Sequence, residues 1–305
     1  MRTKQFATFV ILLIGAGSAN AGDPKAFIKG LESKDSFERQ AAAGAIAKLG
    51  PAAKDAVPAL IKALADPEEA VRRRIPYALG KIGPAAKTAV PALIARLKDE
   101  SGEVRYWTAL ALGQIAPEAD GVFDALKGMV KDPKVGPAAA TTLGLIKSKT
   151  KEVLPVLAEA LSDTELRPYV TTILGKMGPI ALPTLAPLLK SEDEDARTEA
   201  LAALGLVGKD AVPLLAGALK DKAAPVRLNA AASLGRIGPE AKAAVKDLIA
   251  VLKDERREVR ERAAQALGNI GPAARDALPA LEGAEADPDA DVRIAARAAM
   301  KKIRK

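Results

Sequence analysis

The sequence predicts an all-α protein built as a solenoid of about nine helix pairs. A sequence block recurs about every 30–33 residues between positions 22 and 305, and each block holds two stretches with apolar residues at helical spacing. Of the 305 residues, 49% are hydrophobic but only 3% are aromatic. Because alanine supplies much of the hydrophobic share, this composition favours thin layers of closely packed helices over a deep core.

The recurring block has the form Asp-x5-Arg-x2-Ala-Ala-x-Ala-Leu-Gly-x-Ile-Gly-Pro, and Gly-Pro pairs such as Gly50-Pro51 and Gly271-Pro272 separate the copies. The eleventh position before each separator holds the recurring arginine, which the fourth block replaces with Gly136. Its copies are Arg39, Arg72, Arg105, Arg167, Arg197, Arg227, Arg260 and Arg293. A fixed period of this length predicts a stack of repeats.

The first helix of each block, helix A, follows the Gly-Pro pair, with Pro51 in its first turn. A further proline recurs inside the predicted helix, where it removes one backbone hydrogen bond. We therefore expect either a bend or a late helix start at these positions, which are Pro58, Pro91, Pro155, Pro183, Pro213 and Pro279.

The second helix, helix B, is expected to begin after an Asp-rich turn and to end at the next glycine, in a conformation with positive φ. Positions −1, +3, +4, +7 and +10 relative to the recurring arginine are apolar and share one helical face. In the eighth block they are Val259, Ala263, Ala264, Leu267 and Ile270. Neither helix can bury its apolar face alone, so the pairs must stack.

The segment 221–238, which carries Asp221, Arg227 and Leu234-Gly235 in the recurring pattern, resembles the HEAT-like repeats of the phycobilisome lyase type. The resemblance covers nearly all of residues 22–305 and implies one HEAT-like repeat domain, wound as a right-handed α–α superhelix. It also implies that helix B lines the concave side. The fourth block, around Gly136-Pro137, departs from the pattern.

In five blocks an aspartate stands six positions before the recurring arginine, a spacing that brings a turn carboxylate within reach of a guanidinium in helix B. The pairs are Asp66/Arg72, Asp99/Arg105, Asp221/Arg227, Asp254/Arg260 and Asp287/Arg293. The resemblance implies that such pairs staple neighbouring repeats. A row of arginines could instead bind phosphates or acidic polymers, but one pair in each repeat favours the structural role.

Positions +2, +5 and +9 of helix B lie opposite the buried stripe and, by the resemblance, point into the groove. The single tryptophan and all three tyrosines lie on the B helices of blocks two, three and five. Exposed aromatic rings flanked by cations favour partner binding, although the rings could instead only pack against a neighbouring helix. The candidate groove residues are Arg74, Tyr77, Lys81, Tyr106, Trp107, Gln114, Tyr169, Lys176, Asn229, Arg236 and Arg262.

Residues 1–21 have the pattern of a signal peptide. Arg2 and Lys4 precede a short apolar run from Phe6 to about Ala16, and Ala19-Asn20-Ala21 forms a small-x-small cleavage site. We expect cleavage between Ala21 and Gly22 and a periplasmic or extracellular mature chain. The apolar run is too short for a membrane span.

The chain has no cysteine and no histidine. A thiolate nucleophile, an imidazole base and a Cys/His zinc site are therefore excluded, as is the His-Glu iron site of deoxyhypusine hydroxylase. The acidic runs at 192–195 and 287–291 lack the spacing of a calcium loop. We predict no catalytic, metal or cofactor-binding residues.

The formal net charge is +8, from 46 basic and 38 acidic residues that are interspersed along the chain, a balance that favours solubility over nucleic-acid binding. The sequence thus favours an exported, monomeric, non-catalytic scaffold that binds a protein or peptide in its groove. One alternative is chromophore handling or a chaperone role like that of the phycobilin lyases. The third is binding of an anionic polymer or nucleic acid, to which the basic end Lys301, Lys302, Arg304 and Lys305 could contribute.

Overall fold

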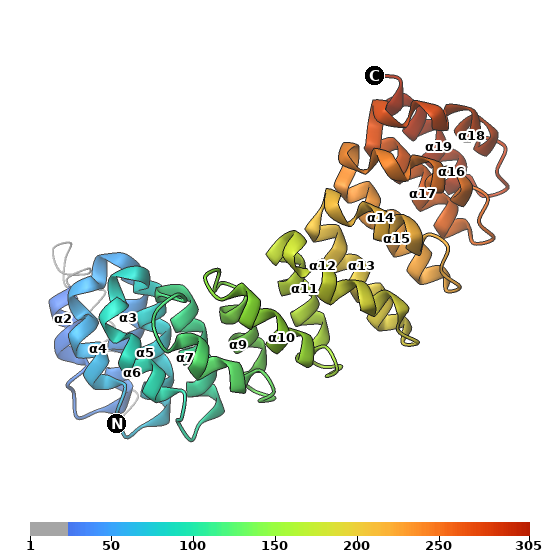
Figure 1. Ribbon diagram of the computed structural model, residues 1–305. Helices are drawn as coiled ribbons and strands as arrows, with labels where there is room; N and C mark the ends of the chain where they lie inside the picture. Colours follow the sequence, from blue (N-terminus) through green and yellow to red (C-terminus); the bar gives the residue numbers. More distant parts are fainter. Residues whose placement is uncertain (1–23) are drawn as a thin grey trace, which may run out of the picture. The chain divides into compact units, whose positions relative to one another are not determined.

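The computed structural model describes residues 24–305, so the predicted signal peptide and its cleavage site lie outside the described residues. In the described part of the chain every regular element is a helix, and the helices form nine consecutive pairs, which confirms the predicted all-α solenoid of repeats (Figure 1). The chain divides into two compact units, one ending at Val153 and the other running from Leu154 to Lys305. The prediction of one repeat domain over 22–305 stays a prediction.

The second helix of each pair is a continuous α-helix. In the first unit these B helices are α3 (Ser36–Leu49), α5 (Glu69–Ile82), α7 (Gly102–Ile115) and α9 (Gly136–Leu143). In the second unit they are α11 (Arg167–Met177), α13 (Glu194–Val207), α15 (Ala224–Ile237), α17 (Arg257–Ile270) and α19 (Ala290–Ile303). Within each unit every B helix packs against the next B helix. Gly50, Gly83, Gly178, Gly208, Gly238 and Gly271 follow B helices with φ between 57° and 89°, as predicted.

Most A helices begin with a 3-10 turn that follows the separating glycine, such as η1 (Gly50–Ala56) before α4 (Val57–Ala63). Pro58 lies in the first turn of α4, and four of the other prolines hold the same place, so the late helix start is the outcome there. Pro155 instead lies inside α10 (Thr150–Ala160). The remaining A helices are α2 (Pro24–Gly30), α6 (Val90–Arg96), α8 (Val122–Leu126), α12 (Leu182–Leu185), α14 (Val212–Ala218), α16 (Val245–Val251) and α18 (Leu278–Ala284).

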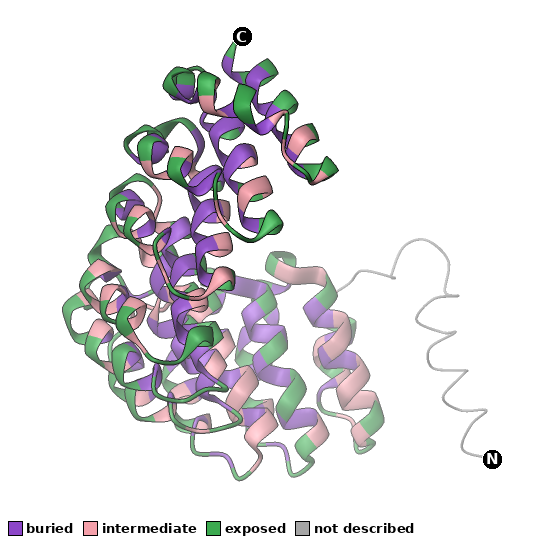
Figure 2. Ribbon diagram, turned by 90° about the vertical axis from the view of Figure 1, so that its right-hand side faces the viewer, coloured by how far each residue is buried: buried purple, intermediate pink, exposed green. Residues whose placement is uncertain are grey.

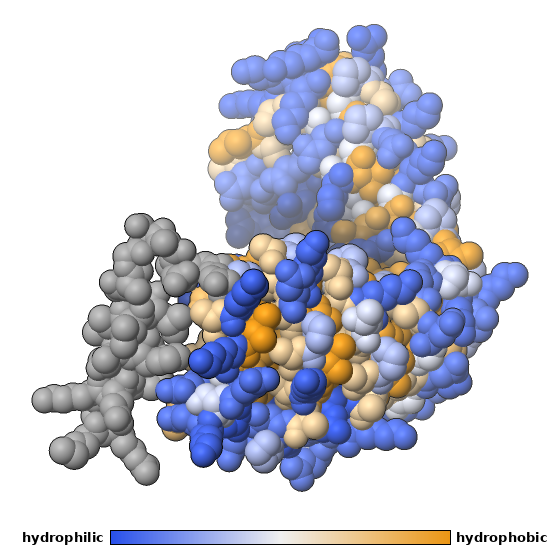
Figure 3. Space-filling view, turned by 90° about the vertical axis from the view of Figure 1, so that its left-hand side faces the viewer, coloured by the Kyte–Doolittle hydropathy of each residue, from blue (hydrophilic) through white to orange (hydrophobic). Residues whose placement is uncertain are grey.

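The core lies where the A and B helices of successive repeats meet, and buried residues follow these contact faces (Figure 2). The five residues predicted for the buried stripe of the eighth repeat are all at most 1% exposed. Many core residues are alanines, so the helices approach closely. On the surface seen from the side of α2, hydrophilic side chains surround smaller apolar groups (Figure 3).

Glycine at position +8 of helix B permits this close approach. A β-carbon at Gly175 would lie 2.6 Å from the carbonyl oxygen of Ala203, and one at Gly268 would lie 2.8 Å from the α-carbon of Ala299. In both cases the obstacle is the backbone of the next B helix. The glycine in the Leu-Gly motif is therefore required by helix packing.

The recurring arginine bridges two repeats, and this corrects the predicted pairing within one repeat. Arg72 donates from Nη1 to the backbone carbonyl of Asp66, six positions earlier, at 3.1 Å. Its Nε donates to the carboxylate of Asp99, 27 residues later, at 2.9 Å. The six-residue spacing therefore places the backbone carbonyl of Asp66, and not its carboxylate, beside Arg72. The Asp66 carboxylate accepts a hydrogen bond from Arg39 of the preceding repeat at 2.6 Å.

The same bridge recurs along the chain, and we call each arginine–aspartate pair a rung. The pairs are Arg39–Asp66, Arg72–Asp99, Arg105–Asp132, Arg197–Asp221, Arg227–Asp254 and Arg260–Asp287, with side-chain distances of 2.6–3.0 Å. In the fifth repeat the recurring arginine is Arg167, which binds two carboxylates, those of Asp193 and Glu199. Gly136 has no side chain to form a rung. Arg293 donates to the carbonyls of Asp287 and Pro288, and no carboxylate partner for it lies in the described residues.

The pKa values of five rung aspartates, Asp66, Asp99, Asp132, Asp254 and Asp287, are lowered, which favours their charged forms. Burial alone would favour the neutral carboxyl of Asp254, but the hydrogen bond from Arg227 and the backbone N–H of Arg256 lower its pKa below the ordinary value. At Asp287 the hydrogen bond from Arg260 is the largest cause of the lowered pKa. The N–H bond also fixes the turn that starts helix B, so one carboxylate orders both the turn and the repeat interface.

One stretch of the described chain, Arg167–Lys190, is long and apolar enough to cross a membrane by length and composition alone. It is not one straight helix, because Gly178 adopts a φ of 80° at the end of α11. The stretch holds α11 and the first part of the following repeat, and 22% of its apolar window is buried inside the protein.

Candidate partner-binding face

In each unit the side chains at positions +2, +5 and +9 of the B helices form the surface that we call the B-helix face. Most of them are exposed or half-buried, as predicted for a surface opposite the core. Ala138 is an exception, because it is 1% exposed in the shorter helix α9. Side chains at position +9 can lie against the position +8 glycine of the preceding B helix. For example, a β-carbon at Gly235 of α15 would lie 3.6 Å from Nδ2 of Asn269 on α17.

In the first unit the structure brings three of the predicted aromatic residues together. Tyr77 of α5 meets Trp107 of α7 edge to face, with ring centroids 5.2 Å apart and an interplanar angle of 82°. Tyr106 meets the same indole at 5.4 Å and 88°. Such T-shaped pairs are favourable beyond the area that they bury. The rings therefore pack across two B helices, which was the alternative to partner binding.

Packing does not remove this cluster from the surface. Tyr77 remains 36% exposed, and Tyr106 and Trp107 are half-buried. The ammonium group of Lys81 lies 5.3 Å from the centroid of the Tyr77 ring, on the side of position +9. The cluster is thus a preformed aromatic platform that keeps an open edge and a cation beside it.

Polar side chains border this aromatic platform. Glu103 binds Lys134 at 2.7 Å. The hydrogen bond from Lys134 is the main cause of the lowered pKa of Glu103, and a hydrogen bond from Trp107 contributes to it. The side chain of Gln114 lies directly against Gly80 of α5, where a residue larger than glycine would meet it. Arg74 stands three positions before Tyr77 on the same face of α5, and its guanidinium lies near Gly44 of α3.

The other candidate groove residues lie in the second unit, apart from the aromatic platform. Tyr169 and Lys176 are both on α11, where Tyr169 is 56% exposed. Asn229 and Arg236 are on α15 and Arg262 is on α17. Asn229 donates to the carbonyl of Pro225 in its own helix, at 2.9 Å.

Seven cations occupy the B-helix face and all are exposed: Lys48, Arg74, Lys81, Lys176, Arg236, Arg262 and Lys302. Within the described residues none of them forms an ion pair with a carboxylate. The only acidic residue at these positions is Glu199, and its carboxylate is bound to Arg167. The face therefore carries uncompensated positive charge, which the interspersed pattern of the sequence does not reveal.

Sequence reasoning left Lys48 and Lys302 out of the candidate site, although counting +9 from Arg39 and Arg293 finds both. Lys302 was assigned to a basic end of the chain. It donates to Oδ1 of Asn269 at 2.9 Å and borders a cavity of 230 Å³. The residues that line this cavity are Gln265, Gly268, Asn269, Ala295, Ala298, Ala299 and Lys302.

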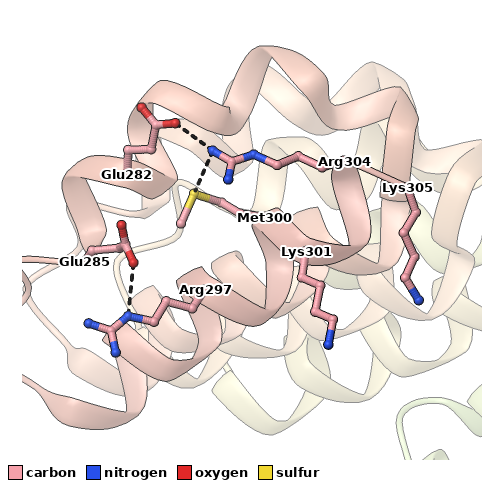
Figure 4. A pocket seen from close by; sticks show the side chains of 7 residues that line it. All are labelled: Glu282, Glu285, Arg297, Met300, Lys301, Arg304 and Lys305. Carbon is pink, nitrogen blue, oxygen red and sulfur yellow. Dashed lines mark hydrogen bonds and ion pairs between the residues drawn. The ribbon is translucent and has the colours of Figure 1, made fainter.

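A second hollow, of 610 Å³, lies at the last repeat and is lined mainly by charged residues (Figure 4). Arg304 binds Glu282 at 2.9 Å and Arg297 binds Glu285 at 3.0 Å, so two of its cations are neutralised. No group of acidic side chains in the described residues is arranged to hold a metal ion.

Comparison with known proteins agrees with the repeat architecture. The family model of HEAT repeats matches residues 24–113, 90–171, 162–232 and 212–301. This match is to HEAT repeats in general, and the phycobilisome lyase subtype stays a prediction. No curated protein sequence matches the chain.

Several solved structures share the fold. Kap95p, from a structure that concerns its binding to RanGDP, aligns with a TM-score of 0.64 and 14% identity over 92% of the chain and 45% of Kap95p. The chain thus spans less than half the length of Kap95p. YibA of Escherichia coli aligns with a TM-score of 0.50 and 22% identity, over 90% of the chain and 99% of YibA. Human deoxyhypusine hydroxylase aligns with 26% identity over 82% of the chain and 96% of the enzyme, at a TM-score of 0.36.

Proposed function

The chain belongs to the HEAT repeat family, and on that premise we propose that it is a non-catalytic scaffold that binds a protein partner on its B-helix face. The observation that carries this proposal is the aromatic platform of Tyr77, Tyr106 and Trp107, which stays open beside Lys81. The few residues that dominate the binding energy at protein interfaces are enriched in tryptophan, tyrosine and arginine. Kap95p, a solenoid of the same fold, binds the protein RanGDP.

The rings of the platform are already fixed by their contacts with one another, so a partner would lose little entropy in ordering them. Tyr77 and Trp107 present apolar area, while Lys81 and Arg74 add charge at the border. We infer that a partner side chain covers the exposed edge of Tyr77 and displaces water from it.

The test is affinity purification of the tagged mature chain with envelope extract of its source cells, followed by mass spectrometry. We expect Tyr77→Ala combined with Trp107→Ala to lower the recovery of specific partners at least tenfold. Phe123→Ala is the matched control, because Phe123 also packs beside cations, with Lys127 and Lys149 at 5.5 and 5.1 Å, but lies on α8. Equal recovery with both variants would remove the platform as the binding site. A co-purifying chromophore would support the lyase-like alternative.

We also propose that the protein is exported, which rests on the pattern of residues 1–21. Expression with the full amino terminus should give a mature chain that begins at Gly22 in the periplasm or the medium. Mass spectrometry of the fractionated protein measures this directly. An intact amino terminus in the cytoplasmic fraction contradicts it.

A further inference from the structure

The B-helix face carries the whole net charge of the mature chain. Residues 22–305 contain 44 basic and 38 acidic side chains. Seven of the basic residues and one of the acidic residues occupy positions +2, +5 and +9 of the B helices, which leaves 37 of each elsewhere. Everywhere else the charges balance. A local excess of this kind attracts acidic partners and raises their association rate.

In the second unit the cations form a spaced row along one edge of the face. Position +9 holds Lys176 on α11, Arg236 on α15 and Lys302 on α19, with Leu206 and Asn269 on the helices between them. Arg262 adds a fourth cation at position +2 of α17. The nearby carboxylates are already engaged, because Glu199 binds Arg167 and Glu261 accepts from Gln265.

The cavity beside Lys302 gives this row an anchoring point. The cavity is lined by Gly268 and three alanines and by the polar side chains of Gln265, Asn269 and Lys302. Lys302 uses one of its donors on Asn269 and has two more. A volume of 230 Å³ with these donors suits a carboxylate side chain.

The spacing of the cations favours a peptide over a nucleic acid. Adjacent packed helices lie about 8–10 Å apart, so cations on alternate helices are roughly 16–20 Å apart. A nucleic-acid strand carries a charge at every nucleotide and would leave most phosphates unpaired on this row. An extended peptide advances about 3.3 Å per residue, so carboxylates about five or six residues apart match it.

We propose that the B-helix face of the second unit binds an extended acidic segment of a protein, whose spaced carboxylates contact Lys176, Arg236 and Lys302. The neutral residues on the helices between the cations, Leu206 on α13 and Asn269 on α17, accept the intervening residues. This inference rests on the proposed scaffold function and names the chemistry of the partner.

The probes are labelled synthetic peptides in a serine–glycine background, each long enough to reach across three cations of the row. One carries three glutamates at every sixth position, and the other carries the same three glutamates contiguously. Fluorescence anisotropy with the mature chain at low ionic strength should show at least fivefold tighter binding of the spaced peptide. Equal affinity for the two peptides would contradict the spaced row.

Arg236→Glu combined with Lys302→Glu should weaken binding of the spaced peptide at least tenfold. Lys246→Glu combined with Lys253→Glu on α16 and its following turn changes the net charge by the same amount, and should change the affinity less than twofold. Equal losses in the two double variants would show that net charge alone attracts the peptide, and would overturn the proposal. Circular dichroism confirms that both variants fold.

Two other occupants are distinguished by the same variants. A single-stranded DNA oligonucleotide of matching length that binds tighter than the spaced peptide would assign the face to nucleic acid. Self-association in analytical ultracentrifugation that Arg236→Glu with Lys302→Glu abolishes would assign it to a second copy. If no acidic peptide binds while Trp107-dependent capture of a protein succeeds, the scaffold function stands and only the acidic partner is wrong.

Discussion

The edge formed by the turns between helices A and B and the face formed by the B helices use the same residue types for opposite purposes. At the turns, Arg72 and Arg227 are nearly buried and each binds an aspartate of the next repeat. On the B-helix face, Arg236 and Arg262 are exposed and bind no carboxylate among residues 24–305. Paired and unpaired arginines can share one helix: Arg227 and Arg236 on α15 are nine positions apart, and Arg260 and Arg262 on α17 are two apart. The difference is burial, because a buried guanidinium must be paired whereas an exposed one stays available to a partner.

Acid should produce the largest effect, since it protonates several rung aspartates together. The pKa values of Asp66, Asp99, Asp132, Asp254 and Asp287 are lowered in the folded chain. Their stabilisation is therefore complete above the unfolded pKa of about 3.9 and is lost as the pH falls through the folded values. Urea unfolding should show constant stability from pH 7 to pH 5 and a steep loss below pH 4. Asp287→Asn removes one titrating rung, so its loss should be shallower than that of the wild type.

A single rung should account for about 2–3 kcal/mol. Asp254→Ala leaves the Arg227 guanidinium, whose side chain is 11% exposed, without its main carboxylate. It also removes the acceptor for the backbone N–H of Arg256. Asp247→Ala is the control, because its partner Lys220 is exposed and the pair should contribute at most about 1 kcal/mol. Equal free energies of unfolding for the two variants would refute the structural role of the rungs.

The packing glycines should have the next largest effect. Gly268→Ala places a β-carbon 2.8 Å from the α-carbon of Ala299, so the two B helices must separate, at a cost of about 1–3 kcal/mol. Gly217→Ala, on helix α14, has nothing within 4 Å of its new β-carbon and should stabilise the chain by about 0.5–1 kcal/mol. Opposite signs in denaturant unfolding are the expected result, and the same sign would contradict it.

Changes on the B-helix face should barely alter stability. Arg236→Gln and Arg262→Gln remove exposed charges that have no carboxylate partner, so each should change the free energy of unfolding by less than about 0.5 kcal/mol. The same denaturant measurement tests this. A loss as large as that expected for Asp254→Ala would mean that these arginines belong to the structural network, and it would erase the contrast between the two regions.

The sequence by itself determined the repeat, the helix ends, the buried stripe and the positions that remain exposed. Each of these follows from local rules: helical periodicity, the positive φ of a terminal glycine, and the need of an amphipathic helix for a partner. For the prolines inside helix A the sequence allowed either a bend or a late helix start, and the structure shows the late start at five of the six. The residues at positions +2, +5 and +9 were likewise countable from the recurring arginine.

Only the tertiary structure decided which carboxylate each arginine binds. A separation of six positions along the chain suggested Asp66 for Arg72, yet stacking brings Asp99 of the next repeat to the guanidinium and leaves the Asp66 carbonyl as the local acceptor. It also decided that Tyr77 and Trp107 touch, and that the seven cations of the B-helix face lack carboxylates. Contacts between repeats depend on how far each helix pair is translated and rotated relative to the last, and that geometry is set by packing rather than by spacing along the chain.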